Sequence, residues 1–387
     1  MFDLFSDDAR RDPFPLYEQA RRVAPVFREP RSGIWMVFDY EGVRRVLTEH
    51  EAFSSRHGPD WMNFSDPPRH SKLRALVSKA FTPRSIVNLE PRIRELSRGL
   101  LDRVVGRGGM DVAADLAVPL PMLVIAEMLG IPPADRERFV RWNDVLLDMG
   151  QAVVGSPETG AVVGRYTAAT AEMSDYLIGL LADRQSDPKD DLLTRLLAAD
   201  VDGQRLTHEE ILGFFQLLLL AGSETTTNLI NNAVVCLLDH PDQLARVRER
   251  PGLLPSAIEE VLRYRSPLQW MYRVTRRDVE LHGKTVPPGE MVLAMIGSAN
   301  RDPGVFADPE RFDVAREPNP HLAFGHGVHF CLGAPLARLE AKIALGDFLE
   351  RVQEFRPATG EPWEPRKGLH VHGPARLPIV FRGKAGG

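Results

Sequence analysis

The segment from residue 207 to residue 239 constrains the fold more than any other part of the chain. It opens with Thr207-His208-Glu209-Glu210, the pattern of a capping box, in which a threonine and a glutamate satisfy each other's backbone N–H groups. Residues 214–220 are then apolar nearly all round the helix, which is typical of a helix that runs through a protein centre. The sequence therefore predicts a long central helix within a mainly α-helical body.

Helix-like periodicity and proline starts predict most of the remaining elements. Helices are expected at 13–24, 39–49, 70–81, 83–105, 119–129, 134–150, 161–184, 190–199, 207–239, 241–250, 255–264 and 335–354. Strands are expected at 34–38, 279–281, 292–295 and 377–381. They lie near both ends of the chain and in its C-terminal third, so they can form one small mixed sheet beside the helices. Because no long linker interrupts the 387 residues, we expect a single domain, 1–387.

Composition narrows the class of protein. The 48 basic and 53 acidic side chains give a formal charge of −5, whereas a nucleic-acid binder usually has a basic surplus. The two cysteines, Cys236 and Cys331, do not suggest a disulfide framework. The acidic N-terminus lacks the pattern of a signal peptide, and the most apolar run, 211–222, is shorter than the ~20 residues that span a bilayer. We expect a soluble, cytoplasmic protein without a membrane anchor.

The middle of the long helix contains residues that weaken helices. Gly222 costs ~1 kcal/mol relative to alanine, and three threonines follow Glu224, which is itself costly to bury. Such a conflict is typical of a functional site. The alternative is a glycine at a helix crossing, with threonine hydroxyls bonded back to the chain.

The segment 324–333, FGHGVHFCLG, is the sharpest signal in the sequence. Its three glycines permit tight turns and close approach to a flat ligand. Cys331 lies just before a predicted helix start, where the free N–H groups lower the pKa of a thiol. One thiolate in such a loop is a way to hold haem iron from one side. A buried inert cysteine, or a nucleophile with His329 as its base, are the alternatives.

This segment resembles the haem-binding signature of the cytochrome P-450 family, F-x-x-G-x-H-x-C-x-G, at every fixed position. Four further motifs of the family occur in the same order along nearly the whole chain. They are D-P-P-x-H-x-x-x-R at 66–74, A/G-G-x-D/E-T at 221–225, E-x-x-R at 260–263 and P-E-R-F at 309–312. The resemblance implies the cytochrome P-450 fold, mainly α with a small β region and with the long central helix over the haem.

The resemblance also implies the roles of individual residues. Cys331 would be the metal ligand of haem b (iron protoporphyrin IX), with Phe324 over the sulfur. Gly325, Gly327 and Gly333 would belong to the cofactor-binding loop. The haem propionates would be bound by His70, Arg74, Arg273 and His329. Glu260, Arg263 and Arg311 would form a buried structural network under the haem.

On the other side of the haem, Ala221 and Gly222 would leave room for dioxygen. Thr225 would hydrogen-bond the activated oxygen, and Glu224 would relay protons to it. Cys236 has no such context and is expected to be a small buried apolar residue. A largely apolar substrate pocket is expected from Trp61, Leu217, Leu218, Gln269, Trp270, Met271 and Pro374, under a mobile lid at 149–164.

The implied activity is a monooxygenase that inserts one atom of O2 into an apolar small molecule, such as a fatty acid, terpenoid, steroid or macrolide-like compound of secondary metabolism. Electrons would come from a separate ferredoxin and its NAD(P)H-dependent reductase, docked near Arg338 and Lys342, and a monomer is expected. The alternatives are a peroxide-driven peroxygenase, an isomerase with the same haem, and a haem-binding sensor without turnover.

Overall fold

The computed structural model describes residues 7–30, 32–59, 61–151, 159–360, 363–366 and 368–383. The chain forms two compact units. Unit 1 comprises Met1–His57, Glu90–Leu120 and Thr225–Gly387, and unit 2 comprises Gly58–Leu89 and Pro121–Glu224. Residues 152–158 of the predicted lid lie outside the described part of the chain.

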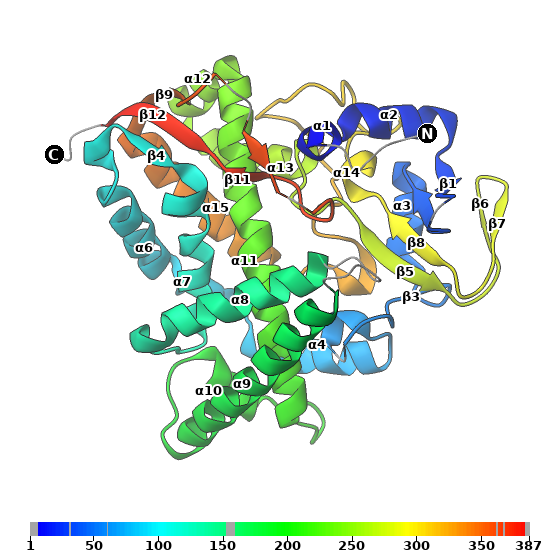
Figure 1. Ribbon diagram of the computed structural model, residues 1–387, viewed down its shortest axis with the longest axis vertical. Helices are drawn as coiled ribbons and strands as arrows, with labels where there is room; N and C mark the ends of the chain where they lie inside the picture. The colour runs from blue at the N-terminus through cyan, green and yellow to red at the C-terminus, as the bar shows by residue number, and fades with distance from the viewer. Residues whose placement is uncertain are drawn as a thin grey trace. The chain divides into compact units, whose positions relative to one another are not determined.

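Unit 1 is built on a five-stranded sheet in the order β1-β2-β8-β5-β3. Figure 1 shows the neighbouring strands β8, β5 and β3 beside α3 and α14. Only β2 and β8 are parallel, with Trp35 opposite Val292. The strands are β1 (Val26–Arg28), β2 (Trp35–Val37), β3 (Phe53–Ser54), β5 (Met271–Thr275) and β8 (Met291–Ala294).

Two apolar clusters form the core around this sheet. One packs Val37, Phe53 and Val292 against α3 (Tyr40–Thr48) and α14 (Ile296–Ala299). The other packs Phe38 and Met295 against α2 (Phe14–Val23). Successive side chains of β8 enter different clusters, with Val292 in the first and Leu293 in the second, so both faces of the sheet are covered.

Helices and three smaller sheets complete unit 1. The helix α15 (Ala334–Arg351) packs against α6 (Glu90–Asp102) and α13 (Leu254–Tyr264), and α12 (Pro241–Glu249) precedes α13. A three-stranded sheet joins β4 (Gly109–Asp111), β12 (Pro378–Gly383) and β9 (Val352–Pro357). Two-stranded sheets pair β6 (Val279–Leu281) with β7 (Lys284–Val286) and β10 (Glu364–Pro365) with β11 (Pro374–Arg376). A short helix, α1, spans Asp7–Arg11.

Unit 2 is helical over its described residues. Its helix α9 (Thr159–Ser186) packs against α8 (Arg136–Gln151) and α10 (Leu192–Ala198), and α10 packs against α4 (Arg69–Ala80). The helix α5 (Pro83–Val87) follows α4. A buried ion pair closes the α9–α10 turn, with Arg184 Nε 2.6 Å from Asp191 Oδ2. The Arg184 guanidinium also donates to the carbonyl of Gly130, so one side chain ties three segments together.

Two helices continue from one unit into the other along the chain. They are α7 (Pro119–Met128) and α11 (His208–Asp239). The capping box predicted for α11 is confirmed, since Thr207 N–H donates to Glu210 and Glu210 N–H donates to Thr207 Oγ1 at 3.2 Å. The helix is unbroken from His208 to Asp239, including the stretch with Gly222.

Two fold predictions were wrong. The segment 83–105 is two helices, α5 and α6, because Pro91 has no N–H and its ring clashes with a helical carbonyl four residues earlier. The strands form four sheets rather than one mixed sheet, since 377–381 pairs with β4 and β9. The mainly α architecture with a small β region was predicted correctly.

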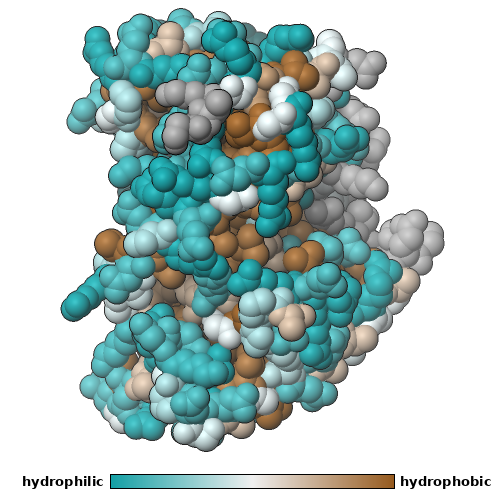
Figure 2. All heavy atoms as spheres, turned by 90° about the vertical axis from the view of Figure 1, so that its left-hand side faces the viewer, coloured by the Kyte–Doolittle hydropathy of each residue, from teal (hydrophilic) through white to brown (hydrophobic). Residues whose placement is uncertain are grey.

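No described helix combines the length and the hydrophobicity needed to cross a membrane. Figure 2 shows one face on which hydrophilic residues predominate, with hydrophobic residues visible between them.

Candidate active site

The cysteine loop lies in unit 1 and is held by its own backbone. The N–H of Cys331 donates to the carbonyl of Phe324 at 2.9 Å, and the N–H of Phe330 donates to the carbonyl of Gly327 at 3.0 Å. Gly325 and Gly327 both adopt φ of +73°, a conformation that glycine adopts without strain. The loop thus turns back on itself and presents Cys331 three residues before α15 begins at Ala334.

Gly327 lets this loop pack closely against the end of α3, and Gly333 lies beside the cysteine sulfur. A Cβ on Gly327 would lie 3.2 Å from Thr48 Cγ2, and one on Gly333 would lie 3.9 Å from the Cys331 sulfur. Cys331 itself is half-buried. A soft thiolate donor beside small residues, at the start of a helix, fits a thiolate ligand to haem iron.

His329 and Arg273 approach the same edge of the five-stranded sheet. The His329 Nε2 atom lies 3.1 Å from Ser55 Oγ, and Ser55 directly follows β3. In the sheet, Ser54 pairs with Val274, the neighbour of Arg273. Arg273 is only 3% exposed and donates to the carbonyl of Tyr272. Unit 1 therefore brings two of the four predicted propionate-binding residues to one sheet edge.

Glu260 and Arg263 form a fully buried ion pair. Both side chains are 0% exposed, and the two Arg263 nitrogens Nε and Nη2 each donate to a Glu260 carboxylate oxygen at 2.8 Å. Glu260 also accepts hydrogen bonds from the N–H of Asp313 and the side-chain amide of Asn319. These donors replace the solvent shell that a buried carboxylate lacks.

The third member of the network was predicted incorrectly. The Arg311 side chain is 62% exposed and lies 3.9 Å from Asp313, so only its backbone carbonyl contacts Arg263. Arg316 supplies the second cation, with its Nε 3.0 Å from Glu260 Oε1 and its side chain 10% exposed. Chain direction explains the difference, because a turn after Phe312 carries Arg316 back over Glu260 while Arg311 faces outward.

Residues 221–227 of α11, which include the predicted oxygen-side residues, differ in burial and in contacts. Ala221 is exposed, and Glu224 and Thr225 are half-buried on adjacent positions of the helix. A Cβ on Gly222 would lie 2.9 Å from Ile125 Cδ1 of α7, so a side chain there would have to displace the end of Ile125. Thr227 Oγ1 donates to the carbonyl of Ala117 at 2.9 Å, which gives that threonine a structural role.

His70 and Arg74 belong to unit 2 and lie four residues apart on α4, so they share one helix face. His70 is 2% exposed, and Arg74 is half-buried. Asp66, Pro67 and Pro68 directly precede this helix.

Among the predicted substrate residues of unit 2, Trp61 has the most defined setting. Its indole N–H donates to Gln216 Oε1 of α11 at 3.0 Å, and its ring stacks on Phe64. Gln216 in turn donates to Thr170 Oγ1 at 3.4 Å, which explains the polar residue within the apolar run of α11. Leu217 and Leu218 are half-buried on the same helix.

The predicted substrate residues of unit 1 divide into two groups. Trp270 and Met271 are half-buried at the start of β5, and Pro374 is buried at the start of β11. The Gln269 side chain is 1% exposed and donates to the carbonyl of Ser266 at 2.6 Å, so it points into the core. We therefore do not retain Gln269 among the residues expected to contact substrate.

Two further predictions concern single residues. Cys236 is 0% exposed on α11, and burial raises its pKa to about 12, as expected of an inert apolar cysteine. Arg338 is not a free docking charge, because both its Nε and its Nη2 donate to the Glu259 carboxylate at 2.7 Å. Lys342 is exposed on α15.

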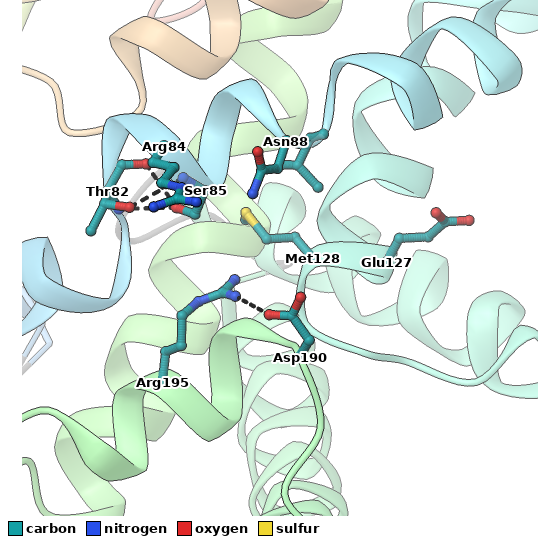
Figure 3. A pocket seen from close by; sticks show the side chains of 9 residues that line it. Thr82, Arg84, Ser85, Asn88, Glu127, Met128, Asp190 and Arg195 are labelled. Carbon is teal, nitrogen blue, oxygen red and sulfur yellow. Dashed lines mark hydrogen bonds and ion pairs between the residues drawn. The ribbon is translucent and has the colours of Figure 1, made fainter.

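A surface pocket of about 280 Å³ in unit 2 contains none of the predicted site residues. Figure 3 shows Arg195 directed at Asp190, 2.9 Å away, while Glu127 points elsewhere and pairs with Arg136. Thr82 and Ser85 at its rim cap α5. The pocket lies apart from the residues predicted for the site, and its Asp190, Arg195 and Glu127 side chains are in ion pairs.

Comparisons with known proteins agree with this arrangement. The family model described as Cytochrome P450 matches residues 160–250 and 252–372. The chain is 41% identical over 392 residues to the cyclomarin C epoxidase CymV of Salinispora arenicola, which covers 98% of each chain. It is 40% identical over 405 residues to the cytochrome P450 monooxygenase PikC of Streptomyces venezuelae, covering 97% of this chain and 92% of PikC.

The fold is also similar to that of a solved cytochrome P450 structure. CYP109E1 from Bacillus megaterium in complex with corticosterone has a TM-score of 0.91 and 40% identity, covering 97% of this chain and all of that one. The chain therefore belongs to the cytochrome P450 family of haem-thiolate monooxygenases, and its cofactor is haem b.

Proposed function

We propose that residues 1–387 form one haem domain that oxidises an apolar small molecule, with Cys331 as the thiolate ligand of the iron. The observation that carries the proposal is the Cys331 loop itself. Its backbone bond to Phe324, the two glycines with positive φ and the adjacent start of α15 hold one thiol in a fixed, electropositive position. When bound, haem would activate O2, a reaction that consumes two electrons and two protons.

Four basic side chains would bind the carboxylates of the cofactor. His329 and Arg273 come from the loop and sheet edge of unit 1, and His70 and Arg74 come from one face of α4 in unit 2. Arginine forks match carboxylates bidentately, and Arg273 is already desolvated at 3% exposure. Loss of either arginine would weaken retention of the cofactor.

Glu224 and Thr225 would deliver protons. Both are half-buried on α11, so the helix places a carboxylate and a hydroxyl at adjacent positions. The hydroxyl of Thr225 would hold a proton at the oxygen-binding side, and Glu224 would replenish it from solvent. The apolar run before them provides the water-poor surroundings that such a transfer needs.

The substrate would be an apolar compound of the size of a fatty acid, terpenoid, steroid or macrolide. Support comes from the bulky residues Trp61, Trp270 and Met271, and from relatives that include an epoxidase of cyclomarin C and a structure with corticosterone. Electrons would come from a separate ferredoxin and its NAD(P)H-dependent reductase. Hydroxylation and epoxidation use the same oxidant, so the pocket would decide the product.

A substrate screen tests the proposed activity. Purified protein is titrated with a panel of apolar compounds, and binding is read from the change in haem spin state. Each compound that binds is then supplied with O2, NAD(P)H, a ferredoxin and its reductase. We expect an oxygenated product that depends on all four components. Product formed equally well with peroxide alone would favour a peroxygenase, and binding without any product would favour a sensor.

Replacing Thr225 with alanine tests the proton-delivery role. We expect the rate of product formation to fall by about 10²-fold, the lower end of general acid–base contributions, while NAD(P)H consumption continues. The measurement is the ratio of product formed to NAD(P)H consumed. Thr225→Ser keeps the hydroxyl and should retain most of the coupling. Wild-type stoichiometry in Thr225→Ala would show that this hydroxyl has no part in the reaction.

A further inference from the structure

Three charged or polar side chains from separate elements of unit 1 meet beside the cysteine loop. Glu259 of α13 accepts both Arg338 nitrogens of α15 at 2.7 Å, in a bidentate pair. The same carboxylate lies 3.1 Å from Nε2 of His321, which is three residues before Phe324. The His321 side chain is 5% exposed and the Glu259 side chain 31%. None of these residues belongs to the Glu260 network, although Glu259 is its chain neighbour.

The hydrogen bonds fix the state of each group. The N–H of Ala323 donates to His321 Nδ1 at 3.2 Å, so the imidazole proton sits on Nε2 and points at Glu259. Burial would raise the pKa of Glu259, but the hydrogen bonds from Arg338 and His321 lower it to about 2. The hydrogen bond from Arg338 to Glu259 raises the pKa of Arg338, and burial lowers it. The negative charges of Glu259 and Cys331 raise the pKa of Arg338 further. Glu259 and Arg338 are therefore both charged at neutral pH.

This cluster contacts Phe324, the first residue of the cysteine loop. The Arg338 guanidinium carbon lies 4.5 Å from the centre of the Phe324 ring, in a cation–π contact. The backbone carbonyl of the same Phe324 accepts the N–H of Cys331 at 2.9 Å. The Phe324 ring is thus fixed by α15 on one side, while its carbonyl fixes the cysteine on the other.

We propose that Glu259, His321 and Arg338 act as a positioning unit that sets the place of the Phe324 ring and the charge felt by the Cys331 thiolate. The inference rests on the proposed role of Cys331 as the iron ligand. Reduction of the iron adds one electron to the bound cofactor, so a cation held nearby favours the reduced form. Arg338 supplies that cation. Glu259 offsets part of the positive charge of Arg338 and orients its guanidinium against the Phe324 ring.

Two charge-removing variants should therefore move the haem midpoint potential in opposite directions. Arg338→Gln removes the cation and leaves Glu259 less compensated, so the potential becomes more negative. Glu259→Gln leaves Arg338 uncompensated, so the potential becomes more positive. Arg338→Lys keeps the charge but loses the planar fork, and it should recover most of the wild-type potential. Both shifts should shrink at high salt, because the pair is partly exposed.

Arg351→Gln is the matched control. Arg351 lies at the other end of α15, 13 residues and roughly 20 Å along the helix from Arg338, and pairs with Asp102. This variant removes the same charge from the same helix and should leave the midpoint potential and the carbon monoxide spectrum unchanged.

The outcomes separate this inference from the proposed function. A strongly red-shifted carbon monoxide band in every variant, with midpoint potentials equal to that of Arg351→Gln, would overturn the positioning role and leave Cys331 as the ligand. A wild-type protein without that band, whose haem coordination survives Cys331→Ser, would overturn both. Opposite shifts in Arg338→Gln and Glu259→Gln, with none in the control, would support the inference.

Discussion

Glu260→Ala is expected to leave little haem-loaded protein. The substitution removes a carboxylate that is 0% exposed and strands Arg263, also 0% exposed, without its counter-charge. Breaking a buried pair in this way costs ~3–5 kcal/mol, against a typical total stability of ~5–15 kcal/mol. The measurement is the haem content per protein after purification, together with the unfolding midpoint in urea. We expect both to fall well below the wild-type values.

Two neighbouring arginines provide the control for this prediction. Arg316→Ala removes the second cation bonded to Glu260, so it should lower both the urea midpoint and the haem content. Arg311→Ala removes a side chain that is 62% exposed, and such surface changes stay within about 0.5 kcal/mol. Wild-type haem content in Glu260→Ala, or a larger loss in Arg311→Ala than in Arg316→Ala, would contradict the network described above.

Cys331→Ser should abolish product formation, because an alcohol is a poor substitute for a thiolate at iron. We expect haem that is bound weakly or without the thiolate signature in its absorption spectrum. The measurement is turnover of a compound identified in the substrate screen, together with the ferric and ferrous spectra.

Cys236→Ala is the matched control, since it removes the other cysteine of the sequence. That residue is fully buried on α11, and burial keeps its thiol protonated by raising its pKa to about 12. A modest loss of stability is expected from the smaller side chain, with the haem spectrum unchanged. Turnover retained in Cys331→Ser and lost in Cys236→Ala would reverse the assignment of the two cysteines.

Helices were predicted well from the sequence because their signals are local. The capping box at Thr207 and the proline at 241 mark starts that lie within one residue of the observed ones. Short strands were mostly missed. Phe53–Ser54 is two residues long, and its existence depends on a partner, Val274–Thr275, that is far away in the chain. Pairing of this kind has no periodicity of its own, so sequence patterns do not reveal it.

The candidate site shows the same division. The glycines and the cysteine of the loop are contiguous in sequence, and their pattern was visible there. The choice between Arg311 and Arg316 was not, because it depends on how the turn after Phe312 orients two nearby cations toward Glu260. The Glu259, His321 and Arg338 cluster was also missed, since its members come from three segments. Only the position of Arg338, seven residues after Cys331, offered a hint.

The difference spectrum of the reduced protein with carbon monoxide tests the central claim most directly. The account predicts a strongly red-shifted Soret band in the wild type, which reports a thiolate opposite the bound gas, and its loss in Cys331→Ser. A band typical of histidine or protonated-thiol ligation in freshly purified wild type would contradict the assignment of Cys331. A purified protein that binds no haem at all would contradict every site role proposed above.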